Sequence, residues 1–188
     1  MRGKKLKGQF FILGALALAI AFYTGLNIPE MAVPPEMDDM VFFTENLKKD
    51  IPLSFNFGLN DTSGLQTLNN FSLLTKDVIG GHYINYSLAW VVVEGITPTE
   101  VNMTFGNYWG KDLDVNLTVQ GAGIPITLFV PNNSTKSAVS PVPGILFTLS
   151  VEFDGENRSV ELSKDKINLY GLIQLKRGEN LIREEIIS

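Results

Sequence analysis

Cysteine is absent from the 188 residues of this chain, and histidine occurs once, at position 82. Without cysteine the chain forms no disulfide bond, so its folded part must be held together by packing alone. Thiol nucleophiles and thiolate metal ligands are excluded for the same reason. Metal binding and general acid–base catalysis rely heavily on histidine, and His82 follows two glycines, a position typical of a solvent-exposed turn.

Familiar catalytic motifs are missing too. The chain contains no GxSxG elbow, no P-loop and no HExxH pair. Adjacent carboxylates occur at Asp38 and Asp39 and at Glu184 and Glu185, which we interpret as a helix cap and a solvated face. We therefore expect no enzymatic activity and no cofactor.

Two acidic clusters could in principle bind Ca²⁺, because carboxylate and amide oxygens are its usual ligands. Asp112 and Asp114 lie on the same side of a predicted strand, and Asp154, Glu156 and Asn157 crowd one turn. The second cluster also has the composition of an ordinary hairpin turn, and nothing in the sequence brings the two together. We expect no metal site.

Basic residues are fewer than acidic ones and unevenly placed. The chain has fifteen Lys and Arg and twenty Asp and Glu, which gives a formal net charge of −5. Four of the cations precede position 8, and none then occurs before Lys48. The remaining chain is acidic, so it repels nucleic acid and anionic lipid. We exclude both as ligands of the C-terminal part.

The gap in charge coincides with the longest apolar segment. Phe10 to Leu26 carries no charge over 17 residues, a helix of roughly 26 Å, and extension to Ile28 brings it close to the ~30 Å of a bilayer core. We predict a basic cytoplasmic leader (1–8), a transmembrane or signal helix (9–28), a proline-rich stalk (29–37) and an extracellular domain (38–188). Basic flanks stay in the cytoplasm, so the domain is expected outside.

Three fates are open for this apolar segment. It could be a secretory signal cut after Ala19-Ile20-Ala21, or an uncleaved signal anchor. The third follows from the motif Lys7-Gly8-Gln9 before FFILGALALAI, which resembles the start of archaeal class III, type IV pilin-like precursors. That resemblance covers about the first 26 residues, and it implies cleavage by a dedicated peptidase between Gly8 and Gln9.

N-glycosylation acceptor triplets are the most frequent motif in the chain. Chance placement of 15 Asn and 23 Ser or Thr would give roughly two Asn-X-Ser/Thr triplets. Eight occur, none before residue 60 and none with proline at the middle position: Asn60, Asn70, Asn85, Asn102, Asn116, Asn132, Asn133 and Asn157. Such sites are used only on chain that has crossed a membrane, so they agree with the predicted orientation.

The domain itself is predicted to be mainly β. One or two short helices are expected before the strands: Asp38 can cap a helix over 39–50 that Pro52 closes, whereas 63–79 is ambiguous and Ser63 could cap a second helix there with Leu65, Leu68 and Ser72. Alternating apolar residues and turn signals predict nine strands, at 53–59, 83–93, 99–105, 112–119, 124–130, 145–153, 158–163, 167–176 and 181–187. Their number and spacing are typical of a two-sheet antiparallel sandwich. The segment 131–144 is predicted to be a long exposed loop.

Details of the predicted strands bear on sugars and ligands. In 99–105 and 112–119 the acceptors Asn102 and Asn116 fall on the polar side, so their glycans should point to water. Trp90 lies within an apolar run and is expected in the core, whereas Trp109, next to glycine, could form an exposed platform for carbohydrate.

Taken together, these patterns predict a membrane-anchored, N-glycosylated extracellular protein. Its expected role is pilin-like, or structural and adhesive, in a cell envelope that the resemblance implies is archaeal. Its expected partners are the membrane, through the N-terminal helix, and copies of itself or other envelope proteins. The alternative is a secreted β-sandwich module that binds glycans or proteins after its signal peptide is removed.

Overall fold

The computed structural model describes residues 36–59, 64–123 and 125–188. The predicted leader, the apolar segment 9–28, most of the stalk, the processing residues Gly8 and Gln9, the acceptor Asn60 and the cap Ser63 all lie outside these ranges. Two compact units divide the chain, Met1–Asp39 and Met40–Ser188. The second unit contains nearly all the described residues.

Two helices precede the strands. α2 spans Glu36–Leu59 and α3 spans Gly64–Gly80. The second predicted helix is thus confirmed, with Leu68 and Ser72 buried and its end at the glycine pair. The first helix begins two residues before its predicted cap, Asp38, and so includes the end of the predicted stalk.

The predicted strand at 53–59 is wrong, because α2 continues through Pro52 to Leu59. Phe55 follows Leu47 and Ile51 at helical spacing, and all three are buried. The other apolar residues of this segment lie outside that stripe: Leu53 is 66% exposed and Phe57 is 70% exposed. A proline inside a helix costs about 3 kcal/mol. Burial of the stripe before and after Pro52 offsets that cost.

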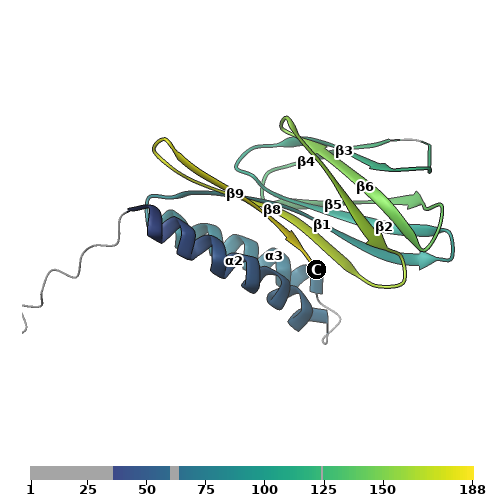
Figure 1. Ribbon diagram of the computed structural model, residues 1–188, viewed down its shortest axis with the longest axis horizontal. Helices are drawn as coiled ribbons and strands as arrows, with labels where there is room; N and C mark the ends of the chain where they lie inside the picture. The colour runs from purple at the N-terminus through teal and green to yellow at the C-terminus, as the bar shows by residue number, and fades with distance from the viewer. Residues whose placement is uncertain (1–35, 60–63, 124) are drawn as a thin grey trace, which may run out of the picture. The chain divides into compact units, whose positions relative to one another are not determined.

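Nine strands form two fully antiparallel sheets (Figure 1). The five-stranded sheet has the order β5-β2-β1-β8-β9, and the four-stranded sheet has the order β4-β3-β6-β7. The strands are β1 (Asn85–Thr97), β2 (Glu100–Tyr108), β3 (Leu113–Val119), β4 (Ile126–Val130), β5 (Ser134–Pro141), β6 (Leu146–Phe153), β7 (Glu156–Ser163), β8 (Asn168–Arg177) and β9 (Asn180–Ile187). Eight of them correspond to predicted strands, and the expected β-sandwich architecture is confirmed.

β5 was not predicted, since its residues lie in the segment interpreted as a loop. It pairs with β2 along the edge of the five-stranded sheet, from Glu100 opposite Pro141 to Asn107 opposite Ser134. Most of its side chains are exposed, so its sequence lacks the apolar alternation that marks a half-buried strand. Pro141 at its end is tolerated because an edge strand has one unpaired side.

The five-stranded sheet is covered on both faces (Figure 1). One face packs on the four-stranded sheet through residues such as Val91, Met103 and Leu117. The other packs under α2 and α3 through residues such as Leu88 and Ile173. This explains the uninterrupted apolar run at 88–93, because a strand buried on both faces needs apolar residues at every position.

Trp90 is the largest side chain under the helices, and Gly106 makes room for it. It lies opposite Gly106 on β2 and opposite Gly171 on β8. A Cβ atom built on Gly106 would lie 2.2 Å from the indole Cε2, so the ring covers that glycine directly. The Trp90 Nε1 donates a hydrogen bond to Ser72 Oγ of α3 at 3.2 Å. The prediction that Trp90 belongs to the core is confirmed.

Two hairpin turns of the domain contain residues with positive φ. Between β6 and β7 the turn consists of Asp154 (φ 48°) and Gly155 (φ 77°). Between β8 and β9 it begins with Gly178 (φ 60°). Two-residue hairpin turns of these conformations match the right-handed twist of the strands they join.

Candidate functional site

The outer face of the four-stranded sheet carries two acceptor asparagines in one cross-strand row, with Glu152 between them. Asn116 of β3 pairs with Glu152 of β6, and Glu152 pairs with Asn157 of β7. This row lies on the face turned away from the sandwich core, where Asn157 is exposed and Asn116 is half-buried. Glycans on both residues would cover the layer farthest from the helices. The expectation that the side chain of Asn116 avoids the core is confirmed.

Two further acceptors stand in the turn that enters β5. Asn133 is exposed with φ 57°, and its Oδ1 accepts a hydrogen bond from Lys76 Nζ at 3.0 Å. Asn132 is half-buried, and its Oδ1 accepts a bond from the Gly110 backbone N at 3.1 Å. Since Asn132 helps to hold the turn, Asn133 is the more accessible of the pair.

Asn85 opens β1 and is exposed. The hydroxyl of its triplet belongs to Ser87, which is half-buried and donates a hydrogen bond to the Trp109 carbonyl oxygen at 3.0 Å. The amide of this site is therefore open to a modifying enzyme, while its hydroxyl is engaged.

Asn70 and Asn102 are placed less favourably. The Asn70 triplet lies within α3, where its hydroxyl residue, Ser72, is fully buried and donates a hydrogen bond to the Leu68 carbonyl oxygen at 2.7 Å. Asn102 is half-buried and donates from Nδ2 to Glu94 Oε1 at 3.0 Å. Its hydroxyl residue, Thr104, is 4% exposed.

The sequence predicted that the polar face of the strand at 99–105, which is part of β2, meets water. This expectation is wrong for Thr104. Asn102 and Thr104 lie on the face of β2 that is opposite to Met103, and Met103 faces the sandwich core. That second face is partly covered by the helix layer and by Ser137 of the neighbouring edge strand, whose Oγ lies 2.9 Å from Thr104 Oγ1. Alternation identifies two faces of a strand, but it does not say whether a further layer covers the polar one.

The single histidine has no catalytic surroundings. His82 is exposed in the turn after α3, and its ring centroid lies 5.1 Å from that of Phe43. The carboxylates of Glu184 and Glu185 point to different partners: Glu184 pairs with Lys48 at 3.0 Å and Glu185 with Arg158 at 3.2 Å. The two adjacent carboxylates thus bind separate cations of the protein.

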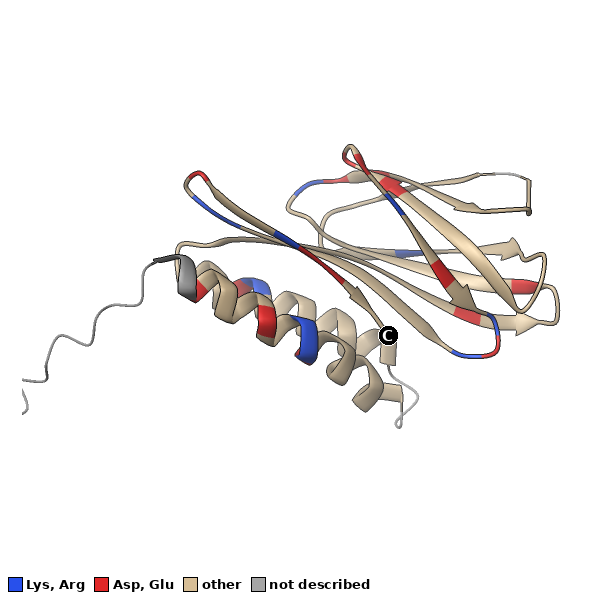
Figure 2. Ribbon diagram, in the orientation of Figure 1, with Lys and Arg blue, Asp and Glu red and all other residues tan. Residues whose placement is uncertain are grey.

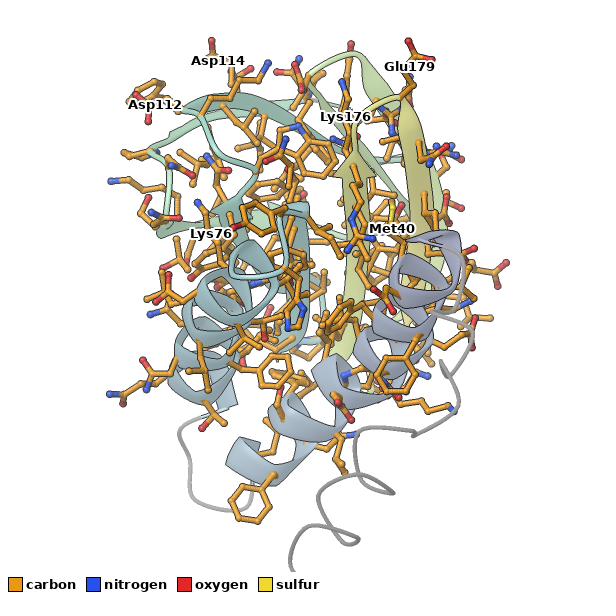
Figure 3. All side chains as sticks on the ribbon, turned by 90° about the vertical axis from the view of Figure 1, so that its left-hand side faces the viewer. Met40, Lys76, Asp112, Asp114, Lys176 and Glu179 are labelled. Atoms are coloured by element: carbon orange, nitrogen blue, oxygen red, sulfur yellow. The ribbon has the colours of Figure 1, made fainter. Side chains whose placement is uncertain are left out.

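Of the acidic residues considered for Ca²⁺, Asp154 and Glu156 are engaged with cations of the protein. Glu156 is buried and pairs with Arg158 and Arg183. Asp154 pairs with Lys111, and this contact holds the pKa of the Asp154 carboxyl below its ordinary value. Within residues 36–59, 64–123 and 125–188, no three acidic or histidine side chains are grouped as a metal site. Asp112 accepts a hydrogen bond from the Asn132 backbone N at 2.8 Å, and Figure 3 shows Asp112 and Asp114 near each other at the upper edge of the view.

Trp109 does not offer a platform for carbohydrate. It is 7% exposed, and its ring packs edge-on against Phe153 with centroids 5.2 Å apart. Its Nε1 donates to Asp154 Oδ2 at 2.7 Å. The indole thus belongs to the core and helps to fix the β6–β7 turn.

One exposed surface was missed by the sequence reasoning. We call it the helix-pair face, and it consists of Phe42, Leu53 and Phe57 of α2 with Leu74 and Val78 of α3. These side chains are between 53% and 70% exposed. The spacing of Leu53 and Phe57, four residues apart after a proline, was the available signal, and it was interpreted as strand alternation instead.

Comparisons with known proteins assign no family to the chain. No protein-family model matches it, and the search of curated proteins also gave no match. Of the two helices in the described ranges, neither combines the length and the apolar content needed to cross a bilayer.

Proposed function

We propose that this chain is a membrane-anchored, N-glycosylated surface protein with a pilin-like or otherwise structural and adhesive role in the cell envelope. The carrying observation is the set of eight acceptor triplets, all at or after residue 60, behind an uncharged segment that follows four cations. In this proposal residues 9–28 lie in the membrane and the domain from residue 38 onward lies outside the cell.

The placement of the acceptors supports this proposal. Asn85, Asn133 and Asn157 are exposed, and Asn157 lies in one row with Asn116 on the outer sheet. Glycans there would shield strand edges and surfaces from proteases and from unwanted strand pairing.

The test is the intact mass and N-terminal sequence of the protein isolated from its own membranes. A chain that begins at Gln9 and is heavier than its polypeptide supports the proposal with pilin-like processing, and a heavier chain from Met1 supports an uncleaved anchor. A start near Phe22 in the culture medium would favour the secreted binding module. An unmodified chain from Met1 would overturn the proposal.

The burial of each acceptor triplet predicts whether it carries a glycan, and the same measurement of mass tests that prediction. Asn157→Gln should remove the mass of one glycan, because Asn157 and its hydroxyl residue Ser159 are both exposed. Asn70→Gln should leave the mass unchanged, because Ser72 is buried in the folded domain. A loss of glycan from the Asn70 variant alone would mean that the transferase acts before the domain folds.

A further inference from the structure

The helix-pair face is unusually apolar for a surface. Phe42 is 64% exposed, Phe57 70%, Leu53 66% and Leu74 63%. All of them belong to α2 and α3, and their exposed fractions show that none of the other described elements covers them. Monomeric domains rarely leave contiguous apolar patches of this kind uncovered, and such patches usually mark an interaction surface.

The face contains hollows as well as projecting rings. One hollow of about 290 Å³ lies between the helices and is lined by Phe43, Phe71 and Val78 among others. A second, of about 370 Å³, is bordered by Leu53, Phe57 and Phe71. Projections beside hollows on one surface are what a self-complementary interface requires, since each copy supplies both.

The charges around the face argue against a lipid surface as its partner. α2 and α3 together carry six acidic and three basic residues. The stretches 51–59 and 64–75, which hold Leu53, Phe57 and Leu74, carry no charge at all (Figure 2). Helices that lie on membranes are typically rich in Lys and Arg, which attract anionic headgroups.

We propose that the helix-pair face binds the same face of a second copy of this chain, in a two-fold arrangement. This inference rests on the proposed function, because residues 9–28 would be held in the membrane and could not fold back over the helices. The 29–35 linker spans at most roughly 25 Å, so it keeps the helix pair near the membrane, where other copies are anchored in the same plane.

The area of the helix-pair face sets the expected strength of the contact between two copies. α3 has 17 residues, so it is about 25 Å long, and two adjacent helices are about 20 Å wide. The footprint is therefore about 500 Å² per copy, or about 1,000 Å² in total, which is near the lower limit for a specific interface. Such an interface is weak in solution, but anchoring in one membrane raises the effective concentration of the partner.

The acceptors of the outer sheet lie away from this face. Asn116 and Asn157 lie on the outer face of the opposite sheet. Asn70 is the acceptor carried by α3, and the hydroxyl of its triplet is buried. Glycans on Asn116 and Asn157 would therefore cover another surface and would not block contact between two helix pairs.

The absence of cysteine allows a direct test with the full-length protein in its native membranes. Leu53→Cys and Leu74→Cys each place one thiol on the face, and Glu161→Cys places one on an exposed position of β7 as a matched control. A short bismaleimide should convert the first two variants to covalent dimers at least about tenfold more efficiently than the control, because the contact brings the two thiols within its reach. Adding Phe57→Glu to the Leu74→Cys variant should abolish that difference. Phe57 is exposed in the single copy, so the added charge is costly only when the face is covered.

Each other outcome overturns the inference. Free labelling of Leu74→Cys by a membrane-impermeant maleimide, without dimers, would mean that the face is open. Protection of that thiol without dimers would mean that lipid or the N-terminal segment covers it. Dimers that form equally in the Glu161→Cys control would mean non-specific crowding.

Failure of the proposed function is recognised separately. Extraction of the same membranes with alkaline carbonate, together with the intact mass, shows whether the chain is anchored and glycosylated. An anchored, glycosylated chain that gives no face-specific dimer would overturn only the self-association. A soluble, unmodified chain would overturn the proposed function whatever the cross-linking shows.

Discussion

Replacing Gly106 with alanine tests the packing that joins the helices to the sheet. The new methyl carbon would lie 2.2 Å from Cε2 and 2.4 Å from Cζ2 of the Trp90 indole, where ordinary carbon contacts are about 3.5–4.0 Å. Relief requires the indole to move by more than about 1 Å. Trp90 is 1% exposed, and its ring is stacked with Tyr108 at a centroid distance of 6.3 Å. The ring therefore has no open side to move into.

The expected cost follows from two contributions. Overpacking a well-filled core costs typically 1–3 kcal/mol, so a clash this close belongs at about 2–3 kcal/mol. Moving the indole also weakens its hydrogen bond to Ser72, which adds about 1 kcal/mol. We expect Gly106→Ala to lower the free energy of unfolding by about 3 kcal/mol, and the melting temperature by about 10 °C for a domain of this size.

Gly171 provides the matched control, because it is the other cross-strand neighbour of Trp90. A Cβ atom at Gly171 would meet its nearest neighbour, the Ala89 carbonyl oxygen, at 3.5 Å, which is an ordinary contact. Gly171→Ala should therefore change stability by less than about 1 kcal/mol. The measurement is urea and thermal unfolding of the purified protein, followed by tryptophan fluorescence. Equal stability of the two variants would refute the placement of the indole over Gly106.

Three further predictions concern single groups. Ser72→Ala should destabilise the protein by about 1–3 kcal/mol, since it leaves the buried Trp90 N–H without an acceptor. A urea midpoint of unfolding equal to that of the wild-type protein would contradict this. The hydrogen bond from Lys111 lowers the pKa of Asp154, so its stabilisation is present above about pH 4 and is lost as the pH falls through the lower, folded-state pKa. Asp154→Asn should therefore reduce the melting temperature at pH 7, with a difference that disappears in acid, whereas a difference independent of pH would exclude the ion pair as its cause. Burial raises the pKa of Tyr108 to about 12 and also raises the pKa of Tyr86 and Tyr170. Unfolded tyrosine ionises near pH 10, so stability should fall steeply between about pH 10 and 12, and ionisation of every tyrosine near pH 10 while the fold persists would be inconsistent with this burial.

Local patterns predicted most of the strands. The hairpins at 146–163 and 168–187 could be found because their turn residues favour positive φ and their flanks alternate in polarity. The segment 53–59 was misassigned because its alternation of Leu53, Phe55 and Phe57 fits a strand as well as a helix. A helix is distinguished from a strand here only by the burial of Phe55 on the same side of α2 as Ile51.

The edge strand β5 shows a different limit. Its side chains are mostly exposed, so the hydrophobic effect leaves no periodic signal in the segment 134–141. Its structure depends on backbone hydrogen bonds to β2, a partner about 30 residues earlier in the chain. Pairing between distant segments cannot be recognised from the composition of one of them.

The sequence by itself determined the acceptor triplets, the absence of disulfides and of thiol chemistry, the uncharged segment behind a basic leader, and the sandwich-like run of short strands. These are properties of composition and spacing, and they do not depend on which residues meet in space. Only the tertiary structure decided that Asn157 is open while the hydroxyl of the Asn70 triplet is buried, and that Leu53, Phe57 and Leu74 share one exposed face. Burial is a property of layers, and the layer that covers a residue comes from distant parts of the chain.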